Sequence, residues 1–425
     1  MAKQKLIKNL TEYPTRIFYG WWMVLAGMLL MFYTTGISFF GFSAFFDAIR
    51  VNLKWTRAEV AMGPSVQALQ TALMAPFAGY LVDKFGPRIV TSIAMFIGGL
   101  GFVVLSKVTT PLHYYLAFIL IGTGMGATAY VLVATAISNW FVKRRGKAMG
   151  ITFMGPGFGG ILVTLIVFFI EVYGWRDVAN FIGFATWGFA IPLALIFRSA
   201  PEKYGQEPDG SNVSLDKTTL LEEKDPEFSF KDVLFHKSYW LYLGALAFQQ
   251  MAISAMVVHH IPALVSFGIT NQLAGVMVLI FTVASLPMRF YSGYLADKYD
   301  SRIVTASMLG FQLAGAILFV VIYNIWTAII FEIIYGIGWG GSNAARLSLQ
   351  GKYWGRSIFG SLMGIQVGIG ALGGFMAPIF VGWVTDIADY RLAFSFLVIP
   401  LAFSVLMIYS MRPPIIKKYR TLGNP

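Results

Sequence analysis

Long apolar stretches alternate with short polar segments along the whole chain. Each stretch has about 20 to 30 residues, which is the length that an α-helix needs to cross the hydrocarbon core of a bilayer. Thr56 and Glu59 fit a capping box at the start of the second stretch. The pattern predicts twelve transmembrane helices, at 17–46, 57–83, 88–107, 111–140, 146–171, 177–198, 238–265, 271–297, 302–323, 326–350, 357–384 and 390–411.

Composition supports a polytopic membrane protein. Of the 425 residues, 57% are hydrophobic and 12% are charged, and the mean hydropathy is +0.68. Soluble domains carry about 25% charged residues. The chain has no cysteine and four scattered histidines, which argues against a disulfide framework and a metal site. We expect no cofactor. An intramembrane enzyme would need a nucleophile–base pair or a metal cluster at membrane depth, and we find neither in the spans.

The net charge of +12 is distributed unevenly over the connecting segments. With the N-terminus placed inside, most of the 32 Lys and Arg residues fall in the inside segments, for example at 143–147 and 412–420. Lys and Arg accumulate on the cytoplasmic side of membrane proteins. We therefore predict cytoplasmic termini and a location in a cell (inner) membrane. The basic charge is then a topology signal, and nucleic-acid binding is not expected.

A polar segment at 199–237 separates six predicted spans on either side. It mixes both charge signs, prolines and small polar residues, which is typical of a solvated tether. We predict an N-terminal six-helix bundle at 1–198, a cytoplasmic linker at 199–237 and a C-terminal six-helix bundle at 238–425. A regulatory role of the linker remains open.

The two halves repeat each other at one constant offset. The segment Gly79-Tyr80-Leu81 corresponds to Gly293-Tyr294-Leu295, and Arg88-Ile89-Val90-Thr91 corresponds to Arg302-Ile303-Val304-Thr305. Because each half has six spans, both halves keep the same orientation and are related by a pseudo-twofold axis along the membrane normal. Two like bundles with a site between them can rock about it, which is the geometry of alternating access.

Arg289 lies well inside the predicted span 271–297. At the rise of an α-helix it is about 12 Å from the polar end of that span. A guanidinium stays protonated in proteins, and charged side chains at membrane depth face a bundle interior or a water-filled cavity. The sequence therefore predicts that Arg289 is the centre of the functional site.

The chain resembles the major facilitator superfamily over nearly its whole length. The segment Gly79–Arg88, with the sequence GYLVDKFGPR, is similar to the superfamily signature between the second and third helices, and Gly293–Arg302 is a looser copy. The resemblance implies charged side chains that pair at the cytoplasmic face in one state and separate in another. The predicted gating residues are Asp83, Lys84, Arg88, Arg145, Asp297, Arg302 and Arg346, and Arg346 is expected near Asp297.

A narrower resemblance is to the monocarboxylate transporter and oxalate–formate antiporter branch. It rests on Tyr19–Val24 at the first helix and on Trp140–Gly150, followed by Gly155–Gly160, at the fifth. In that branch, an arginine of the eighth helix binds the substrate carboxylate, and it stands where Arg289 stands. The resemblance therefore implies that Arg289 binds a carboxylate.

The chain also departs from that branch. Ser285 takes the place of an aspartate of the animal carriers, an aromatic residue near Phe40 takes the place of a lysine, and the span 357–384 has no second basic residue. One fixed cation matches one carboxylate, and a dianion would leave its second charge poorly compensated. This favours a monocarboxylate over oxalate.

Several other residues are candidates for the site. Tyr130, Tyr335, Asn343, Phe40 and Ser285 are predicted to line the cavity, with packing as the alternative role for each aromatic ring. Glu332 is a carboxylate within a span, and His259 and His260 lie near the outer end of another. These three are candidates for proton coupling, although Glu332 has a second possible role as the partner of an outer base.

The sequence thus predicts an all-α membrane protein with the twelve-helix major facilitator fold. The predicted function is secondary transport of small organic anions, above all monocarboxylates such as lactate or pyruvate, by proton symport or anion exchange. The alternatives are an exchanger for oxalate, formate or another organic anion, and a membrane carboxylate sensor that does not transport. The expected partners are the substrate anion, protons or a counter-anion, and the lipid bilayer, and we expect a monomer.

Overall fold

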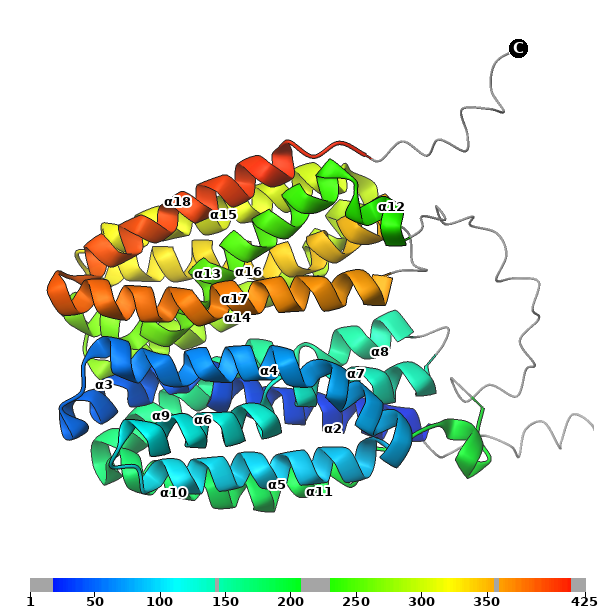
Figure 1. Cartoon of the computed structure of the whole chain (residues 1–425), viewed down its shortest axis with the longest axis horizontal. Helices are drawn as coiled ribbons and strands as arrows, with labels where there is room; N and C mark the ends of the chain where they lie inside the picture. The colour runs from blue at the N-terminus through cyan, green and yellow to red at the C-terminus, as the bar shows by residue number, and fades with distance from the viewer. Residues whose placement is uncertain (1–17, 142–144, 208–229, 355–358, 414–425) are drawn as a thin grey trace, which may run out of the picture.

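The computed structural model describes residues 18–141, 145–207, 230–354 and 359–413. These residues fold into α-helices with short turns of other helix types, arranged as two bundles that lie side by side (Figure 1). We call the end of the molecule where α2 begins and α18 ends the proximal end, and the opposite end the distal end.

The first bundle contains the helices up to residue 194. Three of its membrane crossings are composite, because a turn of π- or 3-10 helix joins two α-helices in each. The elements are α2 (Tyr19–Thr34), η1 (Thr35–Phe40), α3 (Phe42–Leu53), α4 (Arg57–Phe85), α5 (Pro87–Ser106), α6 (Pro111–Met125), α7 (Ala127–Trp140), α8 (Arg145–Thr152), η2 (Gly155–Phe158), α9 (Gly159–Tyr173), α10 (Trp175–Ala185), η3 (Thr186–Ala190) and α11 (Ile191–Ala194).

The second bundle is built from long, continuous helices. A short helical turn η4 (Pro201–Tyr204) and the helix α12 (Phe230–Leu234) lie between the bundles in sequence. The bundle itself consists of α13 (Lys237–Ser266), α14 (Asn271–Lys298), α15 (Ser301–Val320), α16 (Ile325–Trp354), α17 (Phe359–Ile387) and α18 (Tyr390–Tyr409). The division into domains at 199–237 stays a prediction, since residues 208–229 lie outside the described ranges.

Ten helical stretches of the described residues are long and apolar enough to cross a membrane, and the apolar helix Pro111–Met125 is shorter. The more polar α4 adds a helix of 29 residues, which gives the expected twelve-helix arrangement. The capping box predicted at Thr56 and Glu59 is confirmed, with both reciprocal hydrogen bonds in place.

The first crossing is longer than the predicted span 17–46. It runs over Tyr19–Leu53, because the π-helical turn at 35–40 and Gly41, which keeps right-handed helical backbone angles, continue the helix. It ends at Lys54, whose positive φ of 57° takes the chain out of the helix. Arg50 therefore lies on a helix, where it pairs with Asp47 at 2.8 Å.

Close approach of helices joins the two bundles. A Cβ at Gly160 of α9 would lie 2.5 Å from Cα of Leu279 and 2.4 Å from Oγ1 of Thr282, both on α14. Glycine at this position lets the backbones come together, as small residues do in membrane bundles. Helix α4 packs along α17 in a second contact between the bundles. We call the region of these two contacts, α9 with α14 and α4 with α17, the seam between the bundles. Helix α14, which carries Arg289, therefore lies next to the first bundle.

Candidate functional site

Arg289 is partly buried on α14, nine residues before the end of this helix. Its guanidinium carbon lies 4.6 Å from the centre of the Trp339 ring on α16. Its Nε donates a hydrogen bond of 3.4 Å to Oγ of Ser285, one turn earlier on the same helix. A cation held over the face of tryptophan is attracted by the ring's quadrupole without losing its charge. The guanidinium is thus oriented by a ring of α16 and a hydroxyl group of α14.

Two glycines of α16 fix the distance between Arg289 and Trp339. A Cβ at Gly336 would lie 2.6 Å from the carbonyl oxygen of Phe281, and a Cβ at Gly340 would lie 2.2 Å from that of Ser285. The two helices therefore touch backbone to backbone on either side of Trp339. The site rests on a rigid pair of helices, which suits a group that must hold a ligand in one geometry.

Aromatic rings from both bundles form one wall beside the arginine, which we call the aromatic wall. Phe40, at the end of the π-helical turn of the first crossing, lies 5.8 Å from Trp339 and 6.0 Å from Phe281. Trp339 and Phe281 lie 5.2 Å apart. These rings meet across the seam between the bundles, at the depth of Arg289. Ser285 thus lies beside the arginine and Phe40 lies beside the ring that faces it, and their role in lining a substrate cavity stays a prediction.

Other predicted residues lie farther away or are not described. Asn343 lies one turn beyond Trp339 and donates to its carbonyl oxygen at 3.1 Å. Tyr335 is buried beside Phe281 and Phe331, and its backbone lies against the Cβ position of Gly315 on α15, so it packs mainly within the second bundle. The helix that carries Tyr130 is described, but its side chain lies outside the described part of the structure.

Sequence reasoning missed Trp339 and Phe281. Both lie in the spans already singled out, and both are among many aromatic residues: the chain has 11 Trp and 37 Phe. The one local signal is the pair of glycines at 336 and 340, which allows a helix to approach a neighbour closely on that face. The spacing of these two glycines does not reveal that the neighbouring helix is α14, which carries Arg289.

The predicted gating residues lie at the proximal end. Asp297 accepts a hydrogen bond from Ser348 at 2.9 Å, and the pairing of Arg346 with Asp297 stays a prediction. Arg302 pairs with Asp300 at 3.3 Å and donates to the carbonyl oxygen of Met411. Two more charges, Lys84 and Arg88, are exposed. The described contacts of Asp297 and Arg302 stay within their own bundle. The side chains of Asp83 and Arg145 lie outside the described part of the structure.

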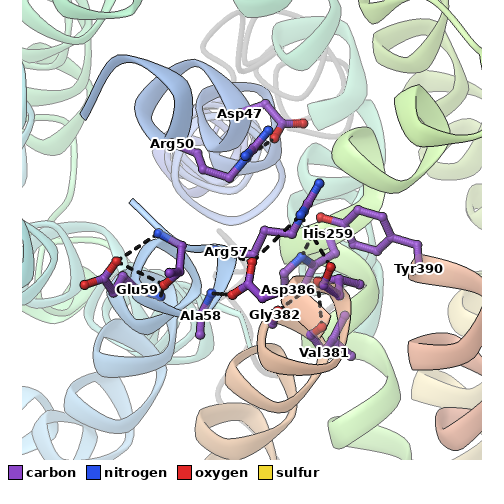
Figure 2. Close-up of polar contacts among 12 residues, drawn as sticks. Asp47, Arg50, Arg57, Ala58, Glu59, His259, Val381, Gly382, Asp386 and Tyr390 are labelled. Atoms are coloured by element: carbon purple, nitrogen blue, oxygen red, sulfur yellow. Dashed lines mark hydrogen bonds and ion pairs between the residues drawn. The ribbon is translucent and has the colours of Figure 1, made fainter. Parts of the chain in front are cut away.

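The distal end is closed by a contact that the sequence did not predict. Asp386, near the end of α17, points toward the start of α4 in the other bundle (Figure 2). Its carboxylate accepts hydrogen bonds from the backbone N–H groups of Arg57 at 3.0 Å and Ala58 at 3.2 Å, and lies 3.8 Å from the Arg57 guanidinium. A carboxylate at a helix N-terminus is stabilised by the helix dipole as well as by these donors. We call this contact the distal latch.

His259 extends the distal latch into the molecule. Its ring lies 4.8 Å from Phe46 of the first bundle, and its nitrogens contact the Tyr390 hydroxyl at 3.3 Å and the carbonyl oxygen of Pro378 at 2.9 Å. The Arg57 guanidinium lies 5.5 Å from the centre of the Tyr390 ring. His259 is thus fully buried at the seam, whereas His260, the next residue, contacts Glu332 at 2.8 Å within the second bundle.

We expect Gly382→Leu to open the distal end. A Cβ at Gly382 would lie 2.9 Å from the backbone of Ala58, so a leucine there wedges α4 away from α17. The chain has no cysteine, and a single Ser254→Cys change places a reporter at the buried seam. Labelling of this cysteine by a membrane-impermeant maleimide from the distal side is expected to rise about tenfold with the wedge, which is the effect of a shift of about 1.4 kcal/mol in the opening equilibrium.

The matched control for this wedge is Gly368→Leu on the same helix, where an added Cβ meets nothing within 4 Å. It is expected to leave the labelling unchanged. Equal labelling in the parent and in Gly382→Leu would mean that α4 and α17 do not close the distal end.

Two bundles of membrane-spanning helices that meet around a cationic site are the architecture of a secondary transporter. The profile of the Major Facilitator Superfamily matches residues 25–266 and 261–421. The chain belongs to this superfamily, and it is a multi-pass membrane transporter rather than an enzyme. The superfamily inferred from the signature at Gly79–Arg88 is thereby confirmed.

Relatives and solved structures agree with this assignment. The chain is 23% identical to monocarboxylate transporter 13 of Rattus norvegicus, over 93% of this chain and 92% of the relative. It is 24% identical to the oxalate:formate antiporter of Oxalobacter formigenes, over 86% of each chain. The fold is similar to that of a bacterial homologue of the human lysosomal transporter Spinster, with a TM-score of 0.71 and 15% identity over 92% of this chain and 95% of that one.

Proposed function

We propose that this protein is a secondary transporter of small monocarboxylates, such as lactate or pyruvate, with Arg289 as the residue that binds the carboxylate. One observation carries the proposal: a permanently charged guanidinium lies well inside α14, nine residues before its end, oriented by Trp339 at 4.6 Å and Ser285 at 3.4 Å. A planar guanidinium matches a carboxylate in a bidentate geometry. The names of the relatives, which include monocarboxylate and oxalate:formate carriers, support the same class of substrate.

The surroundings of Arg289 favour one negative charge and a small apolar body. The aromatic wall of Phe40, Phe281 and Trp339 offers ring surfaces, which pack well against a methyl or methylene group. The α17 segment at 359–387 contains no lysine or arginine. A second carboxylate would therefore find no matching cation on α17, and removing it from water without one carries a large desolvation penalty.

Transport would follow from movement of the bundles about the seam. Phe40 of the first bundle contacts Trp339 and Phe281 of the second, so the substrate would bind where the two bundles meet. The distal latch closes one end of this seam in the present structure. Release of the latch, with closure at the proximal end, would expose the same site to the other face. Exchange of one anion for another remains the alternative to proton symport.

The selectivity of the purified transporter tests the proposed substrate class. In proteoliposomes, unlabelled lactate is expected to inhibit uptake of labelled lactate about tenfold more strongly than oxalate does, because the second charge of oxalate is uncompensated; this ratio corresponds to about 1.4 kcal/mol. Succinate, a longer dianion, serves as the matched comparison and is expected to behave as oxalate does. Stronger inhibition by oxalate would contradict the proposal and favour the oxalate–formate type of exchanger. Absence of lactate uptake by the parent would also contradict it.

A further inference from the structure

One side of α16 carries polar and aromatic residues over much of its length. Their spacing of three and four residues places them in one row on a helix. We call this row the inward stripe, and its members are Glu332, Tyr335, Trp339, Asn343, Arg346 and Gln350. The opposite side of the helix carries Trp326, Ile330 and Ile333, which are exposed and apolar, as lipid-facing residues are. The inward stripe therefore faces the interior of the transporter, where charged side chains of membrane helices are found.

Arg346 brings a second guanidinium to the side of α16 that holds the arginine site. It follows Trp339 by seven residues, which corresponds to a rotation of about 20° and a rise of about 10 Å. The Trp339 ring lies 4.6 Å from the guanidinium carbon of Arg289. Arg346 thus shares the orientation of Trp339 and lies one level closer to the proximal end of the molecule.

The accessibility of the inward stripe increases toward Arg346. Glu332 is 0% exposed, Tyr335 1% and Trp339 8%, whereas Asn343 and Arg346 are partly exposed. Since the stripe faces away from the lipid side of the helix, this exposure is to a space inside the transporter. A small solute that enters from the proximal end therefore reaches the level of Arg346 before that of Trp339.

Arg346 has no carboxylate partner among the described residues. It forms no ion pair there, and its Nε is buried without a hydrogen-bond acceptor. The carboxylate of Asp297 accepts a hydrogen bond from Ser348, on another side of α16. The amide oxygen of Gln350 accepts one from Gln366 at 2.8 Å. A cation held away from bulk water without a counter-charge is costly, and an anion beside it would offset that cost.

We propose that Arg346 is a second binding site for the substrate carboxylate, which the substrate occupies on its way between the proximal face and Arg289. The inference rests on the proposed function and adds a path to it. The planar guanidinium binds a carboxylate through two parallel hydrogen bonds. The carboxylates of oxalate are joined by one bond and cannot span the two levels, so the two arginines bind a small anion in succession.

A site of this kind changes the rates of binding more than the affinity. The charge of Arg346 attracts the anion along the path, for entry and for exit alike. Charges that steer a ligand in this way act on the association rate and on its salt dependence. The final bound state at Arg289 is stabilised much less, because Arg346 is about 10 Å farther along the helix.

Arg346→Gln tests the path in detergent solution. Stopped-flow tryptophan fluorescence follows lactate binding, since Trp339 lies beside Arg289. Association and dissociation are both expected to slow about tenfold, while the Kd changes less than about threefold. Added salt is expected to slow association to the parent and to have little effect on the variant, because it screens the attraction. Arg346→Lys keeps the charge and is expected to restore most of the association rate.

The matched control is Lys352→Gln, which removes one positive charge from the same helix. Lys352 is exposed and donates to the carbonyl oxygens of Ala296 and Asp297. It lies about 120° around α16 from Arg346, away from the inward stripe. Lactate association is therefore expected to match that of the parent. Equal slowing by Lys352→Gln and Arg346→Gln would overturn the inference, since only the net charge of the protein would then matter.

A chemical probe covers the case in which Arg346→Gln does not bind lactate for lack of a correct fold. The chain has no cysteine, and Asn343→Cys places one on the inward stripe between the levels of Trp339 and Arg346. Its reaction rate with a sulfonate-bearing methanethiosulfonate is compared with that of a trimethylammonium-bearing one. The ratio of the two rates is expected to fall about tenfold when Arg346→Lys, which keeps the charge, is exchanged for Arg346→Gln.

The outcomes separate the inference from the proposed function. Unchanged association of lactate with folded Arg346→Gln would overturn the inference and leave the proposed function standing, and so would an unchanged ratio of the two labelling rates. Absence of any lactate binding by the parent would overturn the proposed function and the inference with it.

Discussion

Replacement of Arg289 by glutamine is expected to abolish lactate uptake. Glutamine keeps a hydrogen-bond donor at the place of Nε but removes the only charge that the described residues place over Trp339. Loss of one partner of a buried charge pair costs about 2–5 kcal/mol, which corresponds to at least about a 30-fold loss of affinity. Uptake into proteoliposomes and lactate binding to the purified protein measure the effect, and both are expected to be lost together.

Two further variants make the Arg289 experiment decisive. Arg289→Lys keeps the charge but cannot form a planar, bidentate contact with a carboxylate, so we expect it to retain weak binding. The matched control is Arg50→Gln, at a distal-end arginine that pairs with Asp47 at 2.8 Å, and it is expected to transport as the parent does. A folded Arg289→Gln protein with unchanged uptake would show that the arginine is structural and would contradict the proposed site.

The number and order of the helices were predictable because they depend on local properties. Apolar length marks each crossing, and the repeat of Gly79–Arg88 at Gly293–Arg302 marks the two halves. The end of the first helix was not predictable in the same way. The π-helical turn at 35–40 and Gly41 continue the helix, whereas the polar residues after 46 suggested an end. Hydropathy alone does not show whether a helix ends at its first polar residues or continues past them.

The importance of Arg289 was predictable, but its neighbours were not. A charge inside an apolar span is a local anomaly that needs a reason wherever the helix lies. Trp339 becomes special only through the approach of α16 to α14, which depends on how the two helices are rotated about their axes. The same is true of Glu332 and His260, which are 72 residues apart in sequence. The sequence located both in the outer part of their spans without showing that they meet.

The distal latch was missed for a related reason. Asp386 and Arg57 lie at helix ends in different halves, where single charges commonly anchor the helices at the headgroups. Their meeting depends on how the two bundles are placed against each other, because Asp386 and Arg57 belong to different bundles. The local pattern of apolar and charged residues does not predict a contact between two helix ends that are far apart in the sequence.

Gly340→Ala is expected to disrupt lactate binding, although it adds only one methyl group. The added Cβ would lie 2.2 Å from the carbonyl oxygen of Ser285 and 2.9 Å from its Cα. Backbone atoms cannot turn away as a side chain can, so α14 and α16 must separate by about 1 Å. This displaces Arg289 from Trp339, and a misplacement of that size in a site can weaken its action about 100-fold. Isothermal titration with lactate measures the loss.

The same helix supplies the control that separates this effect from helix stability. At Gly351 an added Cβ meets nothing within 4 Å, so Gly351→Ala is expected to stabilise α16 by about 0.5–1 kcal/mol, as alanine does relative to glycine in a helix. Gly340→Ala is expected to have the opposite effect, since overpacking costs about 1–3 kcal/mol. The two variants should therefore shift the thermal unfolding temperature in detergent in opposite directions. Equal lactate affinity of Gly340→Ala and Gly351→Ala would show that the close contact between α14 and α16 does not position Arg289. The position of the guanidinium would then depend on α14 alone.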